Sequence, residues 1–490
     1  MINTKYDSAS PRSIEAYGQL LIGKTFLDVI NESDISEFKR AEITDAYGNV
    51  KRKGGLGTLL EEIYFGYKAN SNQQADFHEA GVELKVSPYN TLLNGEYRAG
   101  ERLVITMISY DGEIELDFDL SHVWDKIRLI LLVYYFRNRT LTNNLLYQID
   151  FVKLFSPPPE DLEIIKNDYK KIVDKIRLGL AHELSESDTI YLGACTKGTT
   201  AKKSTVKQFY GAHIPARKRA FCLKNSYMNY VLNSFIIGDV DTYEKIIKDS
   251  SELKEIPFEE IVLQRVNRHK GKTDKELCSE FKREYNNNKA QWIDLSYKML
   301  GIKSSRAAEF EKANIVVKAI RINENGGIRE SMSFPAFKFK ELANEKWEDS
   351  TVYDYFCETK FLFVVYNKCG DEYKLKGCKL WNMPNVDLDN IVQKGWQDIK
   401  NVILNGVSFT KKKAKRGTEI SNNLPNKSNN EIIHIRPHAR KSAYRFSNGE
   451  VIGNIQRDAN ELPDGQWMTT QSFWINNSYI LRQIEDVILD

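Results

Sequence analysis

The two halves of this sequence carry the same motifs in the same order. Val82–Lys85 (VELK) has a counterpart in Ile315–Lys318 (IVVK), and Lys126–Tyr134 (KIRLILLVY) has one in Glu358–Tyr366 (ETKFLFVVY). The copies are about 230 residues apart, far longer than the 20–50 residue period of solenoid repeats. The pattern therefore predicts two related domains in tandem.

A third pair of motifs supports the duplication and helps to place its boundaries. The pattern FxxxNSY begins at Phe221 and again at Phe473. A chain of 490 residues is too long for one ordinary core, and a charged stretch follows the first copy of this motif. We expect a first domain over 1–240, a linker over 241–257 and a second domain over 258–490.

The composition indicates a folded protein and excludes several classes. Hydrophobic residues make up 41% and charged residues 28%, with 28 Gly and 12 Pro, so a disordered scaffold is excluded. The net charge of +3 does not by itself indicate a polyanion partner. Six cysteines without a CxxC pair indicate neither a zinc ribbon nor a disulfide framework. Without a signal-like or bilayer-length apolar run, we expect a cytoplasmic protein that does not enter the membrane.

The first half is expected to be mixed α/β, with a strand cluster between helical segments. Ser10-Pro11 is a typical helix start, with a capping residue followed by proline at the first helical position. The β-branched and aromatic runs bounded by polar turns indicate strands. The expected helices cover 10–21, 58–66, 162–180 and 226–235, and the expected strands cover 81–87, 102–110 and 127–135.

One short segment has the residues of a hydrolytic metal site. On a strand Glu83 and Lys85 project to the same side, and Asp76 can fold back beside Glu83 through a turn at Gly81. Two carboxylates form a hard oxygen site suited to Mg²⁺, and an adjacent ammonium can position water or neutralise a phosphate. The same Glu-x-Lys spacing is also common on solvated faces, so the spacing alone does not decide.

The wider context resembles a known family. Glu62 stands fourteen residues before Asp76, and the stretches AGVELKVSP, NGEYRAGERLV, AHELSE, CTKG and RAFCLKNSYM follow in order. The second half adds ESMSFPAFKFKELANEKWEDS, HIRPH and QWMTTQSFWINNSYI. Together they resemble the MutH-related type II restriction endonucleases of the Sau-three-AI group, which carry a PD-(D/E)xK site and cut at GATC. The resemblance implies two tandem MutH-like restriction-endonuclease-fold domains, each a mixed β-sheet flanked by helices.

The resemblance also implies roles for five residues of the first half. Asp76 and Glu83 would bind Mg²⁺, and Lys85 would be the catalytic lysine. Glu62 would be an auxiliary carboxylate acting through a water, and Lys126 a further lysine near the scissile phosphate.

Base reading is implied for a separate segment, YLGACTK, which ends at Lys197. A lysine there suits a guanine contact in the major groove. Arg217 and Arg219 are expected to meet phosphates, which position the duplex without reading it. Cys222 stands where MutH has a tyrosine that senses adenine methylation, so cleavage indifferent to N6-methyladenine is our hypothesis.

The second half has lost the residues that hydrolysis requires. At the positions of the first acid, the second acid and the distal lysine it has Glu309, Val316 and Glu358, and the auxiliary acid aligns near Tyr297. Valine cannot bind a metal ion, and a glutamate would repel the phosphate. We therefore expect no catalysis in this half.

Binding features of the second half are better preserved. IIHIRPHA keeps Arg436 and His438 on a segment equivalent to YLGACTKG. The basic stretch 411–416 before it is interpreted as a loop, either solvated or contacting phosphates. The resemblance implies an effector domain that binds a second GATC site without cutting it.

The sequence thus predicts a type II endonuclease that hydrolyses one phosphodiester bond in each strand of double-stranded GATC, before the G. Because the site is palindromic, we expect a monomer that dimerises on DNA. Two alternatives remain open: a MutH-type repair enzyme that nicks one strand, and a non-catalytic GATC-binding regulator.

Overall fold

The computed structural model describes residues 5–48, 55–68, 74–91, 95–138, 140–197, 204–211, 214–238, 243–286, 288–304, 306–328, 331–414 and 417–489. The chain forms two compact units. The first comprises residues 1–258 and 306–314, and the second comprises residues 259–305 and 315–490. A short segment from the second half of the sequence therefore belongs to the first unit.

The first unit combines helices with three sheets. Its helices are α1 (Pro11–Gln19), α2 (Phe26–Asn31), α3 (Glu37–Tyr47), α4 (Gly55–Leu59), α5 (His122–Ile127), α6 (Pro159–Arg177), α7 (Asn225–Tyr230), α8 (Glu252–Glu255) and α12 (Ala308–Ala313). Its strands are β1 (Glu83–Thr91), β2 (Tyr97–Ala99), β3 (Leu103–Met107), β4 (Ile130–Phe136), β5 (Ile149–Phe155), β6 (Leu192–Thr196), β7 (Thr205–Val206), β8 (Ala216–Arg217) and β9 (Arg219–Leu223).

The second unit is built in the same way. Its helices are α9 (Phe258–Asn267), α10 (Asp274–Glu280), α11 (Lys289–Met299), α13 (Phe339–Asn344), α14 (Thr351–Glu358), α15 (Asn385–Asp387), α16 (Gln393–Asn405), α17 (Ile455–Asp458), α18 (Asn477–Gln483) and α19 (Glu485–Leu489). Its strands are β10 (Ile315–Ile322), β11 (Met332–Phe337), β12 (Lys360–Cys369), β13 (Glu372–Trp381), β14 (Phe409–Ala414), β15 (Gly417–Asn422), β16 (Ile433–Pro437), β17 (Tyr444–Arg445), β18 (Val451–Ile452), β19 (Ala459–Glu461), β20 (Trp467–Thr469) and β21 (Gln471–Ile475).

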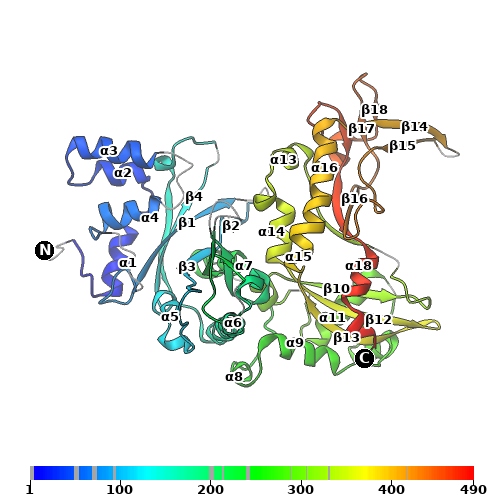
Figure 1. Ribbon diagram of the computed structural model, residues 1–490, viewed down its shortest axis with the longest axis horizontal. Coiled ribbons are helices and arrows are strands. Elements are labelled where there is room, and N and C mark those ends of the chain that lie inside the picture. The colour runs from blue at the N-terminus through cyan, green and yellow to red at the C-terminus, as the bar shows by residue number, and fades with distance from the viewer. Residues whose placement is uncertain are drawn as a thin grey trace. The chain divides into compact units, whose positions relative to one another are not determined.

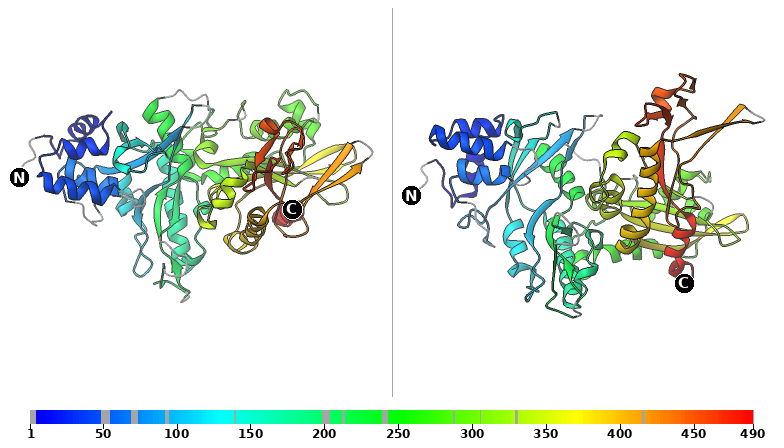
Figure 2. Two further views of the ribbon diagram at one scale, coloured as in Figure 1. Left: turned by 90° about the horizontal axis from the view of Figure 1, so that it is seen from above. Right: turned by 45° about the horizontal axis from the view of Figure 1, so that its top comes forward.

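The main sheet of the first unit has the order β2-β1-β4-β5. β1 runs parallel to β4, and β5 runs antiparallel to it. β4 is an unbroken apolar run because it is buried on both faces. Side chains of α1, α2 and α4 pack with those of β1, β4 and β5 in one core, and these helices lie together on one side of the sheet (Figure 1, Figure 2).

A second, antiparallel sheet of the first unit has the order β3-β9-β6. Helix α6 buries Ile165, Tyr169, Ile172 and Ile176, which lie on one face at spacings of three and four residues. The ring of Tyr169 stacks on Phe221 of β9 at 5.3 Å between centroids, so α6 packs against this sheet.

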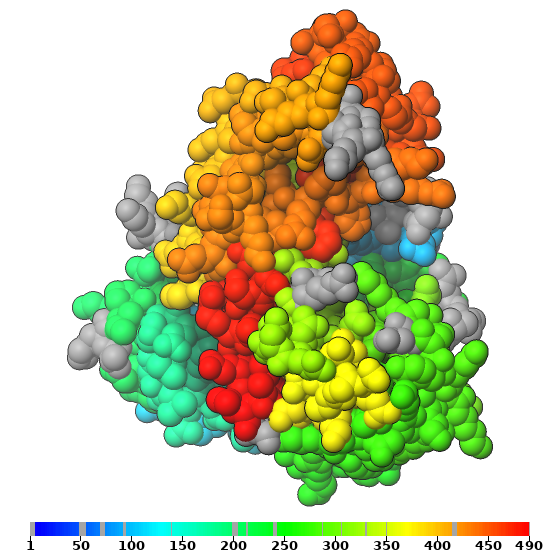
Figure 3. Space-filling view, turned by 90° about the vertical axis from the view of Figure 1, so that its right-hand side faces the viewer, coloured from blue at the N-terminus to red at the C-terminus, as the bar shows by residue number. Residues whose placement is uncertain are grey.

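The second unit repeats both sheets. β10-β12-β13 has a parallel first pair and an antiparallel second pair, and β11-β21-β16 is antiparallel throughout. The core of this unit combines these strands with α13, α14, α16 and α18. In the space-filling view the red C-terminal helices lie against the yellow strands β12 and β13 (Figure 3). The predicted fold class, two mixed α/β domains of related topology, is confirmed.

The structure differs from the expected elements in two places. The expected strand over 127–135 begins at Ile130 and continues to Phe136 as β4, because helix α5 extends to Ile127. The Ser121 side chain caps α5 by accepting from the backbone N–H of Trp124. The basic stretch is not a loop either, because Lys411–Lys413 lie on β14, which pairs with β15. Lys415 and Arg416 lie outside the described residues.

None of the described helices has the length and apolar content of a transmembrane segment.

Candidate active site

A tight hairpin before β1 brings the first predicted acid to the second. Phe77 and Val82 pair through both backbone hydrogen bonds, and Gly81 turns the chain at φ 64°. The backbone N–H of Asp76 donates to Glu83 Oε2 at 3.2 Å, and the N–H of Leu84 donates to Asp76 Oδ2 at 2.9 Å. These reciprocal bonds hold the two carboxylates beside each other at the start of β1.

Glu83 is the centre of a buried charge cluster. Its side chain accepts from Lys85 Nζ at 2.6 Å, and from Lys126 Nζ at 2.9 Å and 3.1 Å. Glu83 is 1% exposed and Lys126 is 8% exposed. Lys85 lies on the same strand face two residues on, while Lys126 comes from the last turn of α5. The structure therefore brings four predicted residues together from β1, its preceding hairpin and α5.

Glu61 is half-buried and interacts electrostatically with this cluster, whereas Glu62, the residue predicted for the auxiliary role, is exposed. Burial, together with the nearby charges of Asp76 and Glu83, raises the pKa of Glu61 to about 7. Residues 60–64 form a π-helix, in which the backbone N–H of Phe65 donates to the carbonyl of Leu60. The wider π turn changes the direction of each side chain, so a prediction based on spacing in the sequence cannot distinguish adjacent glutamates.

Negative charge is in excess beside Asp76. Burial raises the pKa of Asp76 to about 6, and the Glu83 carboxylate adds to the rise, whereas the Leu84 N–H and the two lysines oppose it. Among the described residues, no three His, Cys, Asp or Glu side chains are gathered tightly enough to hold a metal ion in this conformation. The donor chemistry nevertheless fits Mg²⁺, because Asp76 and Glu83 offer adjacent carboxylate oxygens and a cation would relieve the crowded charge.

The predicted base-reading segment lies on β6. Buried Asp168 of α6 accepts from the backbone N–H groups of three successive residues, Ile190, Tyr191 and Leu192, and thereby fixes the start of this strand. Lys197 follows the end of β6 and is half-buried. No sequence motif marks Asp168, and only its place on the buried face of α6 could have indicated its role.

The residues of β8 and β9 differ in accessibility. Arg217 is half-buried on β8, whereas Arg219 is buried and its Nη1 donates to the carbonyl oxygen of Ala194 at 2.7 Å. In this structure Arg219 therefore braces β6 against β9. Cys222 is fully buried beside the carboxylate of Glu186, at 3.8 Å from Sγ to Oε1. Glu186 is paired in turn with Arg102.

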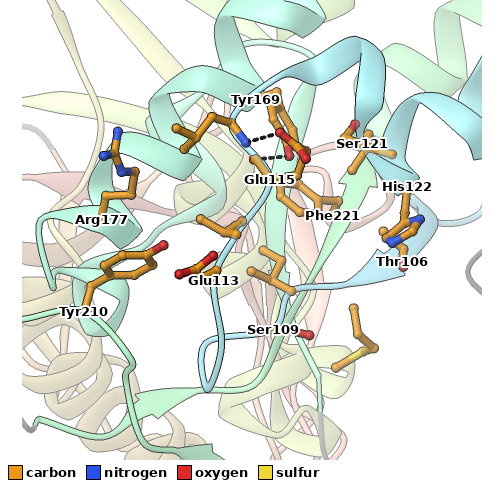
Figure 4. A pocket seen from close by; sticks show the side chains of 15 residues that line it. Thr106, Ser109, Glu113, Glu115, Ser121, His122, Tyr169, Arg177, Tyr210 and Phe221 are labelled. Carbon is orange, nitrogen blue, oxygen red and sulfur yellow. Dashed lines mark hydrogen bonds between the residues drawn. The ribbon is translucent and has the colours of Figure 1, made fainter.

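A separate cavity of about 600 Å³ opens elsewhere in the first unit. Its described lining residues include none of the five predicted catalytic residues. In Figure 4, Glu113, Arg177 and Tyr210 lie on one side and Ser121 and His122 on the other. Glu115 is held by the bond from the Tyr169 hydroxyl to its carbonyl oxygen at 2.6 Å, as Figure 4 also shows.

The second unit places its counterparts differently. Val316 packs against the core, and Lys318 of β10 is half-buried. Glu309 lies on α12, which belongs to the first unit, where its carboxylate accepts from the backbone N–H groups of Ile246 and Ile247 at 2.9 Å each. Glu309 therefore has a structural role in the first unit.

Arg436 and His438 lie at the end of β16 and are exposed. β16 occupies the place in its sheet that β6 occupies in the first unit, at the edge next to the central strand. The Arg436 guanidinium lies over the ring of Trp474 at 5.6 Å, and His438 Nδ1 lies 3.1 Å from the hydroxyl of Ser472. Both side chains therefore reach solvent from a braced position.

Comparison with known proteins places this geometry in a family. Residues 65–168, which include the hairpin, β1 and α5, match the family model of the DNA mismatch repair enzyme MutH. The chain is 29% identical over 188 residues to the DNA mismatch repair protein MutH of Escherichia coli (strain K12 / DH10B), covering 38% of this chain and 79% of that protein. The MutH protein of Escherichia coli O127:H6 is 28% identical over 186 residues.

A longer match extends over both units. The chain is 35% identical over 491 residues to the type II restriction enzyme Sau3AI of Staphylococcus aureus, covering 95% of this chain and 96% of that protein. The expected resemblance to MutH-related type II restriction endonucleases is confirmed. The chain belongs to the family of the type II restriction enzyme Sau3AI.

Proposed function

We propose that this protein cleaves both strands of double-stranded DNA at GATC by Mg²⁺-dependent hydrolysis in its first unit, and that its second unit binds another GATC site as an effector. The observation that carries the catalytic part is the cluster in which Glu83 accepts from Lys85 and Lys126 beside Asp76. Type II endonuclease chemistry needs an acidic metal site and cations for the phosphate, and this cluster has both.

Asp76 and Glu83 would hold the ion through their carboxylates. When bound, Mg²⁺ supplies a Lewis acid that polarises the phosphate and lowers the pKa of a coordinated water. Lys85 would orient the attacking water and donate to the developing negative charge. Lys126, buried at the end of α5, would contact a non-bridging phosphate oxygen.

We assign the auxiliary role to Glu61 in place of Glu62. The charges of Asp76, Lys85 and Glu83 act on the Glu61 carboxylate, which supports this assignment. With its pKa raised to about 7, it can accept and return a proton near neutral pH through a water.

Base reading is proposed for Lys197, and backbone contact for Arg217. Arg219 would hold the reading strand through its bond to Ala194. Cys222 would affect the reading strand only through packing, since it is fully buried. We therefore propose that cleavage is indifferent to adenine methylation because the small side chain of Cys222 leaves space beside β6.

A palindromic site cut in both strands needs two catalytic units, so we propose that the chain dimerises on DNA. The effector role of the second unit is supported by exposed Arg436 and His438 at the end of β16. It is also supported by the loss of the metal-binding acid at Val316.

Digestion of an end-labelled plasmid with Mg²⁺, followed by sequencing of the ends, tests the catalytic proposal. We expect cuts in both strands before the G of GATC, with 5′-phosphate ends. A nick in one strand would favour a MutH-type repair enzyme, and no Mg²⁺-dependent cleavage would favour a GATC-binding regulator.

Comparison of plasmids with one and two GATC sites tests the effector role. We expect faster cleavage of the two-site plasmid, because one site raises the local concentration of the other. Equal rates per site would contradict an effector role for the second unit.

A further inference from the structure

Beside strand β10 the second unit has a cavity of about 340 Å³. That volume falls within the range of about 300–1,000 Å³ typical of ligand sites. The cavity lies along β10, which is the edge strand of sheet β10-β12-β13. Its described lining comes from β10, the segment before β11 and the start of β11, α11, α18 and Tyr373 of β13.

The cavity is cationic. Lys289, Lys318 and Arg321 line it, and no described lining residue is acidic. Lys318 and Arg321 form no ion pair or hydrogen bond with the described residues. Burial without a counter-charge lowers the pKa of Lys318. Lys318 and Arg321, with no acidic side chain among the described lining residues, are suited to an anion.

Arg321 is held in place by aromatic rings. Its guanidinium lies 5.3 Å from the ring centroid of Trp292 and 5.9 Å from that of Tyr373. The two rings meet edge to face at 5.1 Å, so the stacking surface is rigid. Stacking fixes the plane of a guanidinium while its N–H groups stay available to an anion. Ser331 adds a hydroxyl to the same lining.

The position of Lys318 in its sheet indicates that the anion is a phosphate. It stands on β10 opposite Phe363 of β12, and Lys85 stands on β1 opposite Leu132 of β4, so each lysine lies on the strand that runs parallel to the central strand. In the first unit the acid Glu83 neutralises this lysine, whereas Val316 leaves Lys318 without such a partner.

We propose that this cavity is a metal-independent site for the backbone of the effector DNA, in which Lys318 binds a phosphodiester on one face of the edge strand β10 and Arg321 contacts the backbone from the other face. The inference rests on the proposed effector role of the second unit and deepens it. The site uses the place of the former catalytic centre, with fixed cations in place of a metal ion and its acids. Binding there requires no divalent ion, unlike cleavage in the first unit.

The test uses the full chain, a plasmid with one GATC site, and a GATC duplex oligonucleotide with phosphorothioates at the scissile positions as the added effector. Cleavage with Mg²⁺ is measured against oligonucleotide concentration. For the variant K318M/R321M we expect a basal cleavage rate within twofold of wild type. The oligonucleotide concentration that gives half-maximal stimulation should rise at least about tenfold. The salt dependence of this concentration should weaken by about one unit of log–log slope for each lost phosphate contact.

Two matched variants control for charge and folding. K394M removes one exposed positive charge of α16 outside the cavity and should respond as wild type. K318R keeps the cation and should shift the half-stimulating concentration less than threefold. Equal thermal unfolding midpoints of the variants show that the second unit remains folded.

A measurement without substitution serves as a second test. In EDTA, the duplex should protect the Lys318 amine from acylation at least about fivefold, and Lys394 should not be protected.

The outcomes separate the two proposals. A wild-type chain that the oligonucleotide does not stimulate would overturn the effector role, and this inference with it. Stimulation of K318M/R321M at the wild-type concentration, or acylation of Lys318 unaffected by DNA, would overturn the cavity alone and leave the effector role standing.

Discussion

The two units share a mixed sheet built on a parallel strand pair and an antiparallel three-stranded sheet, yet the equivalent strands β1 and β10 carry different charges. In the first unit Glu83 lies among Lys85, Lys126 and the Asp76 hairpin. In the second, β10 carries Val316 and Lys318, and Lys318 forms no ion pair within the described part of the chain. Strand order and pairing depend on the apolar pattern of the central strands, which both units keep. The fold can therefore persist after the chemistry of one copy is lost.

The difference also shows which part of a nuclease site can be reused. Removing the acid while keeping the lysine turns a site that balances charge around a metal into one that presents a net positive charge. Such a site still attracts a phosphate and cannot activate water. The proposed binding role of the second unit is consistent with the replacement of this acid by Val316.

The largest expected effect comes from the lysine of the first unit. Lys85→Ala removes the cation that would orient water and stabilise developing charge, so Mg²⁺-dependent cleavage should fall at least about 10³-fold. DNA binding in Ca²⁺ should change little. The matched variant Lys318→Ala should keep the basal cleavage rate. A comparable loss of basal cleavage in both variants would show that the two units share catalysis and would break the comparison.

The second prediction concerns α12, which lies in the second half of the sequence but belongs to the first unit. Lys312 Nζ donates to both Asp161 oxygens at 2.7 and 2.9 Å, and both side chains are buried. Lys312→Met leaves Asp161 buried without its cation and with only the Tyr227 hydroxyl as a side-chain partner among the described residues, so the free energy of unfolding of the first unit should fall by about 3–5 kcal/mol in urea. The half-exposed pair of Lys245 and Glu160 is the control, because Lys245→Met should cost less than about 1 kcal/mol. A loss for Lys312→Met no larger than this control would show that α12 is not tightly docked.

Lowering the pH should reduce the stability of the second unit more than that of the first. Burial lowers the pKa of His434 to about 4, below the ordinary value of 6.5, and its Nδ1 lies 2.6 Å from Asn476 Oδ1. The unfolded chain binds a proton at His434 more readily than the folded chain does. The stability that neutral His434 contributes is therefore complete above pH 6.5 and is lost as the pH falls towards 4. The second unit should lose up to about 3 kcal/mol over that window. Hydrogen exchange resolved by unit measures it, and His434→Gln should remove most of the dependence. The same slope in that variant would assign it to other groups.

Much of the fold could be predicted from the sequence, because apolar runs and repeated motifs report burial directly. The run at β4 and the copy at β12 identify the two central strands. The hairpin was also predictable, since Gly81 permits the positive φ that returns Asp76 to Glu83.

Other features depend on tertiary contacts that local patterns do not contain. Nothing in the periodicity indicates that residues 306–314 join the first unit, because Glu309 and Lys312 find their partners there only after folding. Burial of Arg219 against Ala194 is likewise a packing outcome, since an arginine next to basic residues is more typical of a phosphate contact.

The smallest expected effect tests the auxiliary carboxylate, for which the sequence predicts Glu62 and the structure favours its neighbour Glu61. Glu61→Gln keeps the size of the side chain and removes the carboxylate beside Asp76, so cleavage should fall about 10- to 100-fold. Glu62→Gln, one residue on, changes an exposed carboxylate and should alter the rate less than twofold. The two variants differ from wild type by the same atoms, so steady-state rates at saturating Mg²⁺ compare position alone. The reverse order of effects would mean that the π-helix over 60–64 rearranges when DNA binds and turns Glu62 inward. Such a change would extend the difference between the units, because the corresponding segment of the second unit, α11, is an α-helix.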